Sequence, residues 1–340
     1  MVHDFPSHFQ KKQEKKEKKM NQNKLKQYNL TGSFHTFTVT TEGLIDAKSE
    51  TLKDAYKVTV NQDNTRSTTT INLNKINGDL LSFDDFKEKF EVFRTSIGME
   101  NYRFNRADFR LDSYDKEHYQ AFLKLNKYLI SAVALTYNVK NCYKTDNLFS
   151  HKQLSIAIKN DYFQLENYDR NAKSLLTENH QETAQSRLEE RTVSKEFRRL
   201  YSDDHCRDGM EILKEEFTLN WFSRWDKALE NLDAVGNRYN DELERIYREY
   251  KDAYPVRFRS ITEFIMQHQD SIFSQKQLIN LLERLGVASA KERAKSYKKR
   301  YGIEYISKKD AKTAVEEIKR ATLDYFKGGT DVPFLKNDTL

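Results

Sequence analysis

The chain has 340 residues, of which 37% are hydrophobic and 32% charged, with only 10 Gly and 3 Pro, a composition that can build a folded core. No apolar run approaches the roughly 20 residues needed to cross a bilayer, and the N-terminus has no apolar signal-like core. Cys142 and Cys206 have no nearby partner cysteine, so we expect a cytoplasmic protein with no membrane association, no zinc site and no disulfide framework.

The net charge of +6 is unevenly distributed. Between Lys11 and Lys26 there are eight Lys and two Glu, and the rest of the chain carries 50 basic and 50 acidic residues. We therefore expect residues 1–28 to form a basic, disordered arm, most of which would be lost if Met20 were the true start. Any DNA binding by the remaining chain must depend on local basic patches.

Residues 29–200 alternate between β-prone runs and segments with helical periodicity. Residues 67–73, for example, place Thr69 and Ile71 on one side of a strand, and Ser82 can cap the helix that follows. The predicted strands are 34–41, 56–60, 67–73, 102–112, 154–158, 162–168 and 185–193, and the predicted helices are 82–97, 116–134 and a short one after 168. This pattern predicts an α+β domain, in which β-α-β units build a sheet of mostly antiparallel strands with helices packed on one face.

Residues 201–330 are predicted to form an all-helical C-terminal region, with helices at 210–232, 239–250, 260–266, 274–285 and 289–301. A tight turn at Gly286 joins the last two helices, and residues 302–306 can form a short strand or wing. The second helix of this pair is strongly basic. Its cations, which we expect to bind DNA phosphates, are Lys291, Arg293, Lys295, Lys298, Lys299 and Arg300. An ordinary packed helix pair with a solvated charged face is the alternative interpretation.

The predicted strand 102–112 carries the first candidate site. Its two-residue period puts Arg106, Asp108, Arg110 and Asp112 on one face, opposite Phe109 and Leu111 on the other. Oxygen ligands on one sheet face suit a hard cation such as Mg²⁺ or Mn²⁺. Solvation of an exposed strand face would account for the same pattern without a metal.

Two further segments carry charged or reactive side chains. If residues 187–191 are extended, Arg187, Glu189 and Arg191 share a face, where one carboxylate stands between two guanidiniums. An exposed helix with charge pairs is the alternative for this segment. Tyr168 ends a predicted strand and is followed by Asp169 and Arg170, and a phenol needs a nearby cation or base to act as a nucleophile at neutral pH.

Taken in order, these segments resemble the replication-initiation-factor family of bacterial plasmids and conjugative elements. The resemblance covers roughly residues 65–195 and lies in the order and spacing of R-x-D-x-x-x-D at Arg106 to Asp112, Tyr-Asp-Arg at Tyr168 to Arg170, and R-x-E-x-R at Arg187 to Arg191. Arg170 stands where the family usually has Lys, and the family's glycine-containing turn before the tyrosine strand is missing.

The resemblance implies a nicking domain that opens one DNA strand at an origin through a 5′-phosphotyrosine intermediate and leaves a 3′-OH primer for rolling-circle replication. It makes Tyr168 the nucleophile, helped by Arg187 and Arg170, and makes Asp108, Asp112 and Glu189 ligands of Mg²⁺ or Mn²⁺. Arg106 and Arg191 would bind DNA. The implied partners are origin DNA with a single-stranded or extruded nick site, a host helicase and a polymerase, and the arrangement allows a homodimer.

Two other functions stay open at this point. A conjugative relaxase of the same family would use the same chemistry. A DNA-binding initiator or regulator that recruits host proteins without cutting would need only the basic patches.

Overall fold

The computed structural model describes residues 28–42, 45, 56–60, 66–72, 82–139, 141–142, 155–170, 184–202, 208–253 and 261–327. The predicted arm at 1–28 lies outside these residues, apart from Tyr28. The helix predicted after residue 168 also lies outside them, apart from Arg170.

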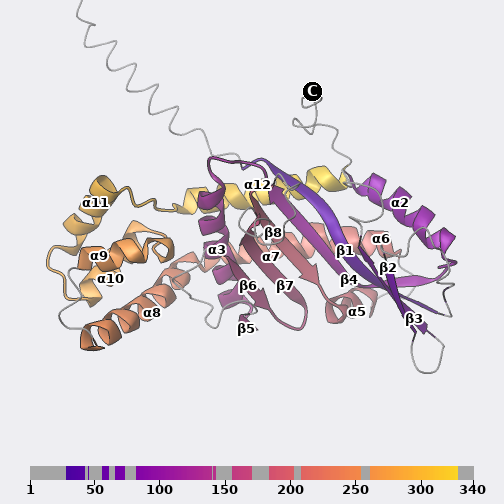
Figure 1. Ribbon diagram of the computed structural model, residues 1–340, viewed down its shortest axis with the longest axis horizontal. Coiled ribbons are helices and arrows are strands. Elements are labelled where there is room, and N and C mark those ends of the chain that lie inside the picture. The colour runs from indigo at the N-terminus through magenta and orange to yellow at the C-terminus, as the bar shows by residue number, and fades with distance from the viewer. Residues whose placement is uncertain are drawn as a thin grey trace, which may run out of the picture.

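An eight-stranded sheet forms the centre of the described structure (Figure 1). The strand order is β2-β3-β1-β4-β8-β7-β6-β5, and the neighbouring strands pair antiparallel throughout. The strands are β1 (Leu30–Glu42), β2 (Tyr56–Val60), β3 (Arg66–Asn72), β4 (Tyr102–Ser113), β5 (Asn141–Cys142), β6 (Ile156–Lys159), β7 (Phe163–Asp169) and β8 (Ser186–Thr192). The α+β prediction is confirmed.

One face of this sheet is apolar because alternate residues of each strand are hydrophobic. Phe34 of β1 and Phe109 of β4, for example, are fully buried with ring centroids 5.3 Å apart. Helices cover this face (Figure 1), and Trp221 stands edge-on to Phe109 at 5.9 Å. Gly32 lets the helix Lys308–Phe326 approach β1, because a Cβ at that position would lie 3.3 Å from both the Ala321 carbonyl oxygen and the Tyr325 Cβ.

The helices associated with this core come from both halves of the chain. They are α2 (Phe83–Ser96), α3 (Tyr119–Thr136), α5 (Ser194–Ser202), α6 (Gly209–Glu215), α7 (Trp221–Glu230), the first part of α8 (Leu232–Ala253) and α12 (Lys308–Phe326). A π-helical turn, Glu216–Asn220, joins α6 to α7. Ser82 caps α2 by accepting a hydrogen bond from the Asp85 amide, as the sequence predicts.

A second, smaller core lies at one end of the molecule (Figure 1). It joins the later part of α8 to α9 (Ile261–Gln267), α10 (Gln275–Arg284) and α11 (Ala290–Tyr301). Residues on both sides of position 200 belong to the larger core, since Trp221 of α7 contacts Phe109 and α12 packs on β1.

The segment after α11 differs from the predicted strand or wing. Residues 302–306 form no strand, and the Ile306 amide instead donates a hydrogen bond to the Phe273 carbonyl. The Tyr305 hydroxyl donates to the Ala294 carbonyl at 3.2 Å. Phe273 belongs to the large core and Ala294 to the small core, so these contacts hold the segment against both cores.

Candidate functional site

The second face of the sheet is polar where β4, β8 and β7 lie side by side. Their register forms three rows across the strands, which are Asp112–Arg187–Tyr168, Arg110–Glu189–Glu166 and Asp108–Arg191–Gln164. The two-residue period places all nine side chains on the face opposite the aromatic core. The sequence-predicted residues of three separate segments are thus neighbours on one surface.

Tyr168 lies on this polar face and not behind the helices. Its hydroxyl is 3.4 Å from an Arg187 guanidinium nitrogen and 3.5 Å from a Glu189 carboxylate oxygen. Arg187 is itself fixed, because its guanidinium donates two hydrogen bonds to Asp112 at 2.6 and 2.9 Å. The phenol is therefore held between a buried cation and a carboxylate, which is an arrangement that can position a nucleophile.

Opposing influences act on the phenol. Burial raises the pKa of Tyr168, the Arg187 guanidinium lowers it, Glu189 raises it, and Arg170 lowers it, with a net shift upward. The hydroxyl is consequently protonated at neutral pH in this state, and attack on an electrophile requires a group that accepts its proton. Glu189 is the carboxylate within reach of that proton.

Asp108 stands at the other end of the polar face, where two arginines enclose it. Arg106 donates to its two carboxylate oxygens at 2.8 and 2.5 Å, and Arg191 donates to the same two oxygens at 3.0 and 3.1 Å. Arg191 also reaches Gln164 at 3.2 Å. Both arginines are partly exposed, so they can meet a phosphate at the edge of the site.

The three predicted metal ligands do not surround a common point. Asp108 and Asp112 are four residues apart on one strand, a Cα separation of about 13 Å, whereas Mg²⁺ binds oxygens at about 2.1 Å. Each aspartate already accepts hydrogen bonds from arginine, and no group of three or more His, Cys, Asp or Glu among the described residues could hold a metal ion. As placed, these side chains do not fit a three-carboxylate site, and a requirement for Mg²⁺ or Mn²⁺ stays a prediction.

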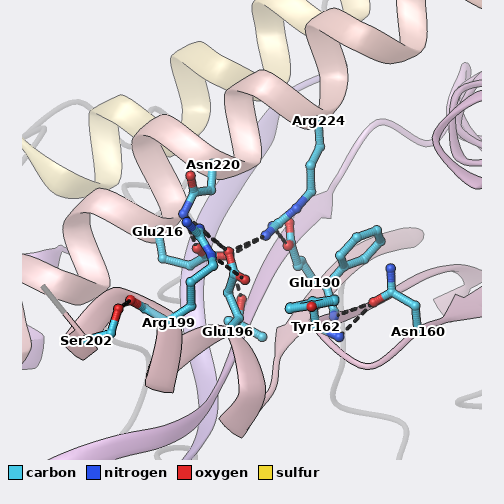
Figure 2. Close-up of polar contacts among 11 residues, drawn as sticks. Asn160, Tyr162, Glu190, Glu196, Arg199, Ser202, Glu216, Asn220 and Arg224 are labelled. Carbon is cyan, nitrogen blue, oxygen red and sulfur yellow. Dashed lines mark hydrogen bonds and ion pairs between the residues drawn. The ribbon is translucent and has the colours of Figure 1, made fainter. Parts of the chain in front are cut away.

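A buried ionic cluster lies directly behind the site, on the helix-covered face of β8. Glu190 alternates with Glu189 and points away from Tyr168, toward Arg224 of α7 (Figure 2). Arg224 also donates to Glu216 at 2.7 Å and lies 3.6 Å from Glu196. The π-helical turn supplies both Glu216 and Asn220 to this cluster. The cluster therefore ties the strand carrying Arg187, Glu189 and Arg191 to the helices beneath it.

Burial raises the pKa of Glu190 to about 8, and the Glu216 and Glu196 carboxylates add to the rise while Arg224 opposes it. The sequence pattern predicted an ordinary extended strand at Glu190 and no role for its side chain. In a strand of alternating polar and apolar residues, a charged residue at a core-facing position is unexpected. That exception in the pattern is the signal that could have identified Glu190 as a residue with a buried partner.

The six predicted cations of α11 are all exposed. Ala294 and Tyr297 hold the helix on the small core, and Lys291, Lys295 and Lys298 form a row at successive turns along one exposed side of the helix. The three other cations are also exposed, with Arg293 and Arg300 on the opposite side of the helix from this row. We call the first three the lysine row. Figure 1 shows α11 at one end of the molecule, apart from the strands β4, β7 and β8 that carry the Tyr168 site.

Comparisons with family models, with curated proteins and with solved structures each found no match to this chain. Among the described helices, none has both the length and the apolar character needed to span a membrane. The functional assignment therefore depends on the geometry of the site and on the sequence resemblance.

Proposed function

We propose that this chain nicks and rejoins one DNA strand at a plasmid or mobile-element origin, through a covalent 5′-phosphotyrosine, and so initiates rolling-circle replication. The observation that carries the proposal is the position of the Tyr168 hydroxyl, between the Arg187 guanidinium and the Glu189 carboxylate on an arginine-rich sheet face. A tyrosine buried among the helices would have argued against it.

In the proposed reaction, Arg187 and Arg170 attract the scissile phosphodiester to Tyr168. The Tyr168 hydroxyl transfers its proton to Glu189 as its oxygen attacks phosphorus. The bond between phosphorus and the 3′ oxygen breaks, and that oxygen takes a proton from water. The products are a 5′-phosphotyrosine and a free 3′-OH, and attack by a 3′-OH on the phosphotyrosine reverses the step without an external energy source.

The neighbouring ion pairs fix the geometry of this step. Arg187 cannot rotate freely because Asp112 holds two of its nitrogens, and the Glu190–Arg224 contact holds β8 from behind. Rigid donors around a reacting phosphate stabilise the charge that develops in the transition state without reorganising. No step in this scheme passes through a metal ion, so a metal requirement is a separate prediction.

The lysine row fits duplex DNA near the nick site, since clustered exposed cations bind phosphates without reading sequence. The proposed partners are origin DNA, a host helicase and a polymerase, with a homodimer as a further prediction. A relaxase of a conjugative element would use the same chemistry. A protein that binds DNA through the lysine row without cutting is the second candidate, which the exposed basic face of α11 favours.

The test is relaxation of a negatively supercoiled plasmid that carries the DNA flanking this protein's own coding sequence, with Mg²⁺ or Mn²⁺ present. The wild type should relax the plasmid, and Tyr168→Phe should not, although it should bind DNA as the wild type does because it lacks only a hydroxyl. Tyr162→Phe is the matched control, since Tyr162 lies exposed in the turn that precedes β7. A wild type that binds but never relaxes the plasmid would identify the non-cutting protein.

A further inference from the structure

An irregularity in β1 brings an additional side chain to the polar face. In the pairing of β1 with β4, Phe34 faces Phe109 and Thr36 faces Asp108, so His35 is an extra residue in the strand. Phe34 and Phe37 both enter the core and contact Phe86, with ring centroids at 5.1 and 5.6 Å. Because two core residues stand three positions apart, both residues between them point to the polar face, as a β-bulge allows.

The imidazole of His35 is oriented from one side only. Its Nδ1 is 2.8 Å from the Thr36 hydroxyl, and Nε2 has no hydrogen-bond partner in the part of the chain that the structure describes. When the Thr36 hydroxyl donates to Nδ1, the ring carries its proton on Nε2, and that N–H is available to a ligand.

The charged groups around His35 belong to the Tyr168 site. They are Arg110 and Asp108 on β4, Arg187 on β8, and Arg170 after β7. Arg187 and Arg170 also act on the phenol of Tyr168. Burial, Arg110 and Arg187 lower the pKa of His35 to about 4, so the ring is neutral at physiological pH. A neutral N–H donor among guanidiniums suits an anionic oxygen.

His35 and Tyr168 lie on strands on either side of β4 and β8, with His35 next to the Asp108–Arg191 row and Tyr168 in the Asp112–Arg187 row. β1 and β7 are separated by two strands, β4 and β8, which places their backbones about 14 Å apart. Phosphodiester displacement proceeds in line, so the attacking and departing oxygens lie on opposite sides of phosphorus. If Tyr168 attacks from β7, the departing oxygen is directed toward β1.

Given the proposed function, on which this inference depends, we propose that His35 is a further catalytic residue, whose Nε2–H donates a hydrogen bond to the departing 3′ oxygen. In this step the bond from the Tyr168 oxygen to phosphorus forms and the bond from phosphorus to the 3′ oxygen breaks. The phenolic proton passes to Glu189, water protonates the 3′ oxygen, and His35 remains neutral throughout. Thr36 is a positioning residue that selects the tautomer.

The experiment compares two single-stranded oligonucleotides that carry the cut site mapped in the plasmid assay. One has the ordinary 3′ oxygen at the scissile phosphate, and the other has sulfur in its place. A thiolate departs without help from a hydrogen bond. His35→Ala should therefore cut the ordinary oligonucleotide about 100-fold more slowly in single turnover and the sulfur oligonucleotide at close to the wild-type rate, while Tyr168→Phe cuts neither.

Two variants and a control sharpen the comparison. His35→Gln should recover part of the rate because an amide N–H remains, and Thr36→Val should show a smaller defect that the sulfur substrate also removes. His118→Ala is the control, since His118 lies half-exposed beside Asp115 at the start of α3. All variants should bind the uncut oligonucleotide as the wild type does.

A His35→Ala protein that cuts the ordinary oligonucleotide at the wild-type rate would overturn the inference and leave the proposed function intact. An equal defect on both oligonucleotides would also overturn it, because it would indicate a structural role. A wild type that cuts neither oligonucleotide would overturn the proposed function and this inference together.

Discussion

Replacing Arg224 by methionine should destabilise the protein strongly. Met keeps most of the apolar stem but removes the guanidinium, whose carbon lies 4.7 Å from the centroid of the Phe163 ring. Both Glu190 and Glu216 are fully buried, so Glu216 would lose its cation and Glu190, which burial keeps protonated at neutral pH, would lose its hydrogen-bond donor. Breaking a buried ion pair by deleting one partner costs about 3–5 kcal/mol, a large fraction of the roughly 5–15 kcal/mol that stabilises a folded protein.

Urea unfolding followed by tryptophan fluorescence measures this change, since Trp221 and Trp225 are buried on the same helix as Arg224. Arg245→Met is the control. Arg245 pairs with Glu242 and Glu249 on the exposed surface of α8, where ion pairs contribute about 0–1 kcal/mol. A free energy of unfolding for Arg224→Met within about 1 kcal/mol of the wild type would refute the role given to this cluster.

Two further predictions concern pH and salt. The raised pKa of Glu190, about 8 against an ordinary 4.5, means that the folded state holds this proton more tightly. The contribution of this proton to the free energy of unfolding is therefore full below pH 4.5 and is lost as the pH rises through 8. Urea unfolding should show that Glu190→Gln gains stability relative to the wild type as the pH rises over that range. Parallel pH profiles of the two proteins would contradict this. Replacing the lysine row by alanine should weaken duplex DNA binding and reduce the slope of log affinity against log salt by about 0.9 for each DNA phosphate that the lysines no longer neutralise. Fluorescence anisotropy measures both quantities, and the control Lys312→Ala, which alters an exposed lysine of α12, should change neither. An unchanged slope for the protein with all three lysines of the row replaced would show that α11 does not bind the duplex.

The arrangement of the polar face was predictable from the sequence because strand periodicity is local. Alternation alone places Asp108 and Asp112 on one face of β4. The local composition around Arg187 and Glu189 favoured an exposed helix, and the strand there was predicted from the family resemblance. Local patterns also predicted nearly all of the strands and the N-cap of α2. The pairing register was not predictable, so the sequence could not show that Arg187 binds Asp112 and lies beside Tyr168.

The features that the sequence did not reveal depend on long-range contacts or on broken patterns. α12 packs on β1 from nearly 300 residues away, and no local signal encodes that partner. Glu190 occupies a core-facing position where it contacts Arg224, a partner that lies 34 residues away in the sequence. His35 became visible through the three-residue spacing of Phe34 and Phe37, which interrupts the alternation expected of a strand. Segment 302–306 has a strand-like sequence, but its hydrogen bonds go to Phe273 of the large core and Ala294 of the small core.

The most direct test of the proposed chemistry is to trap the covalent intermediate and identify the residue that carries it. The protein would be denatured during reaction with the supercoiled plasmid, the DNA digested to nucleotides, and the peptides analysed by mass spectrometry, with a parallel reaction in EDTA to test the predicted metal requirement. We predict a nucleotide attached through its 5′ phosphate to the peptide that contains Tyr168, and no adduct in the Tyr168→Phe protein. An adduct on a different residue, or cleavage of the plasmid with no adduct at all, would contradict the assignment of Tyr168 as the nucleophile.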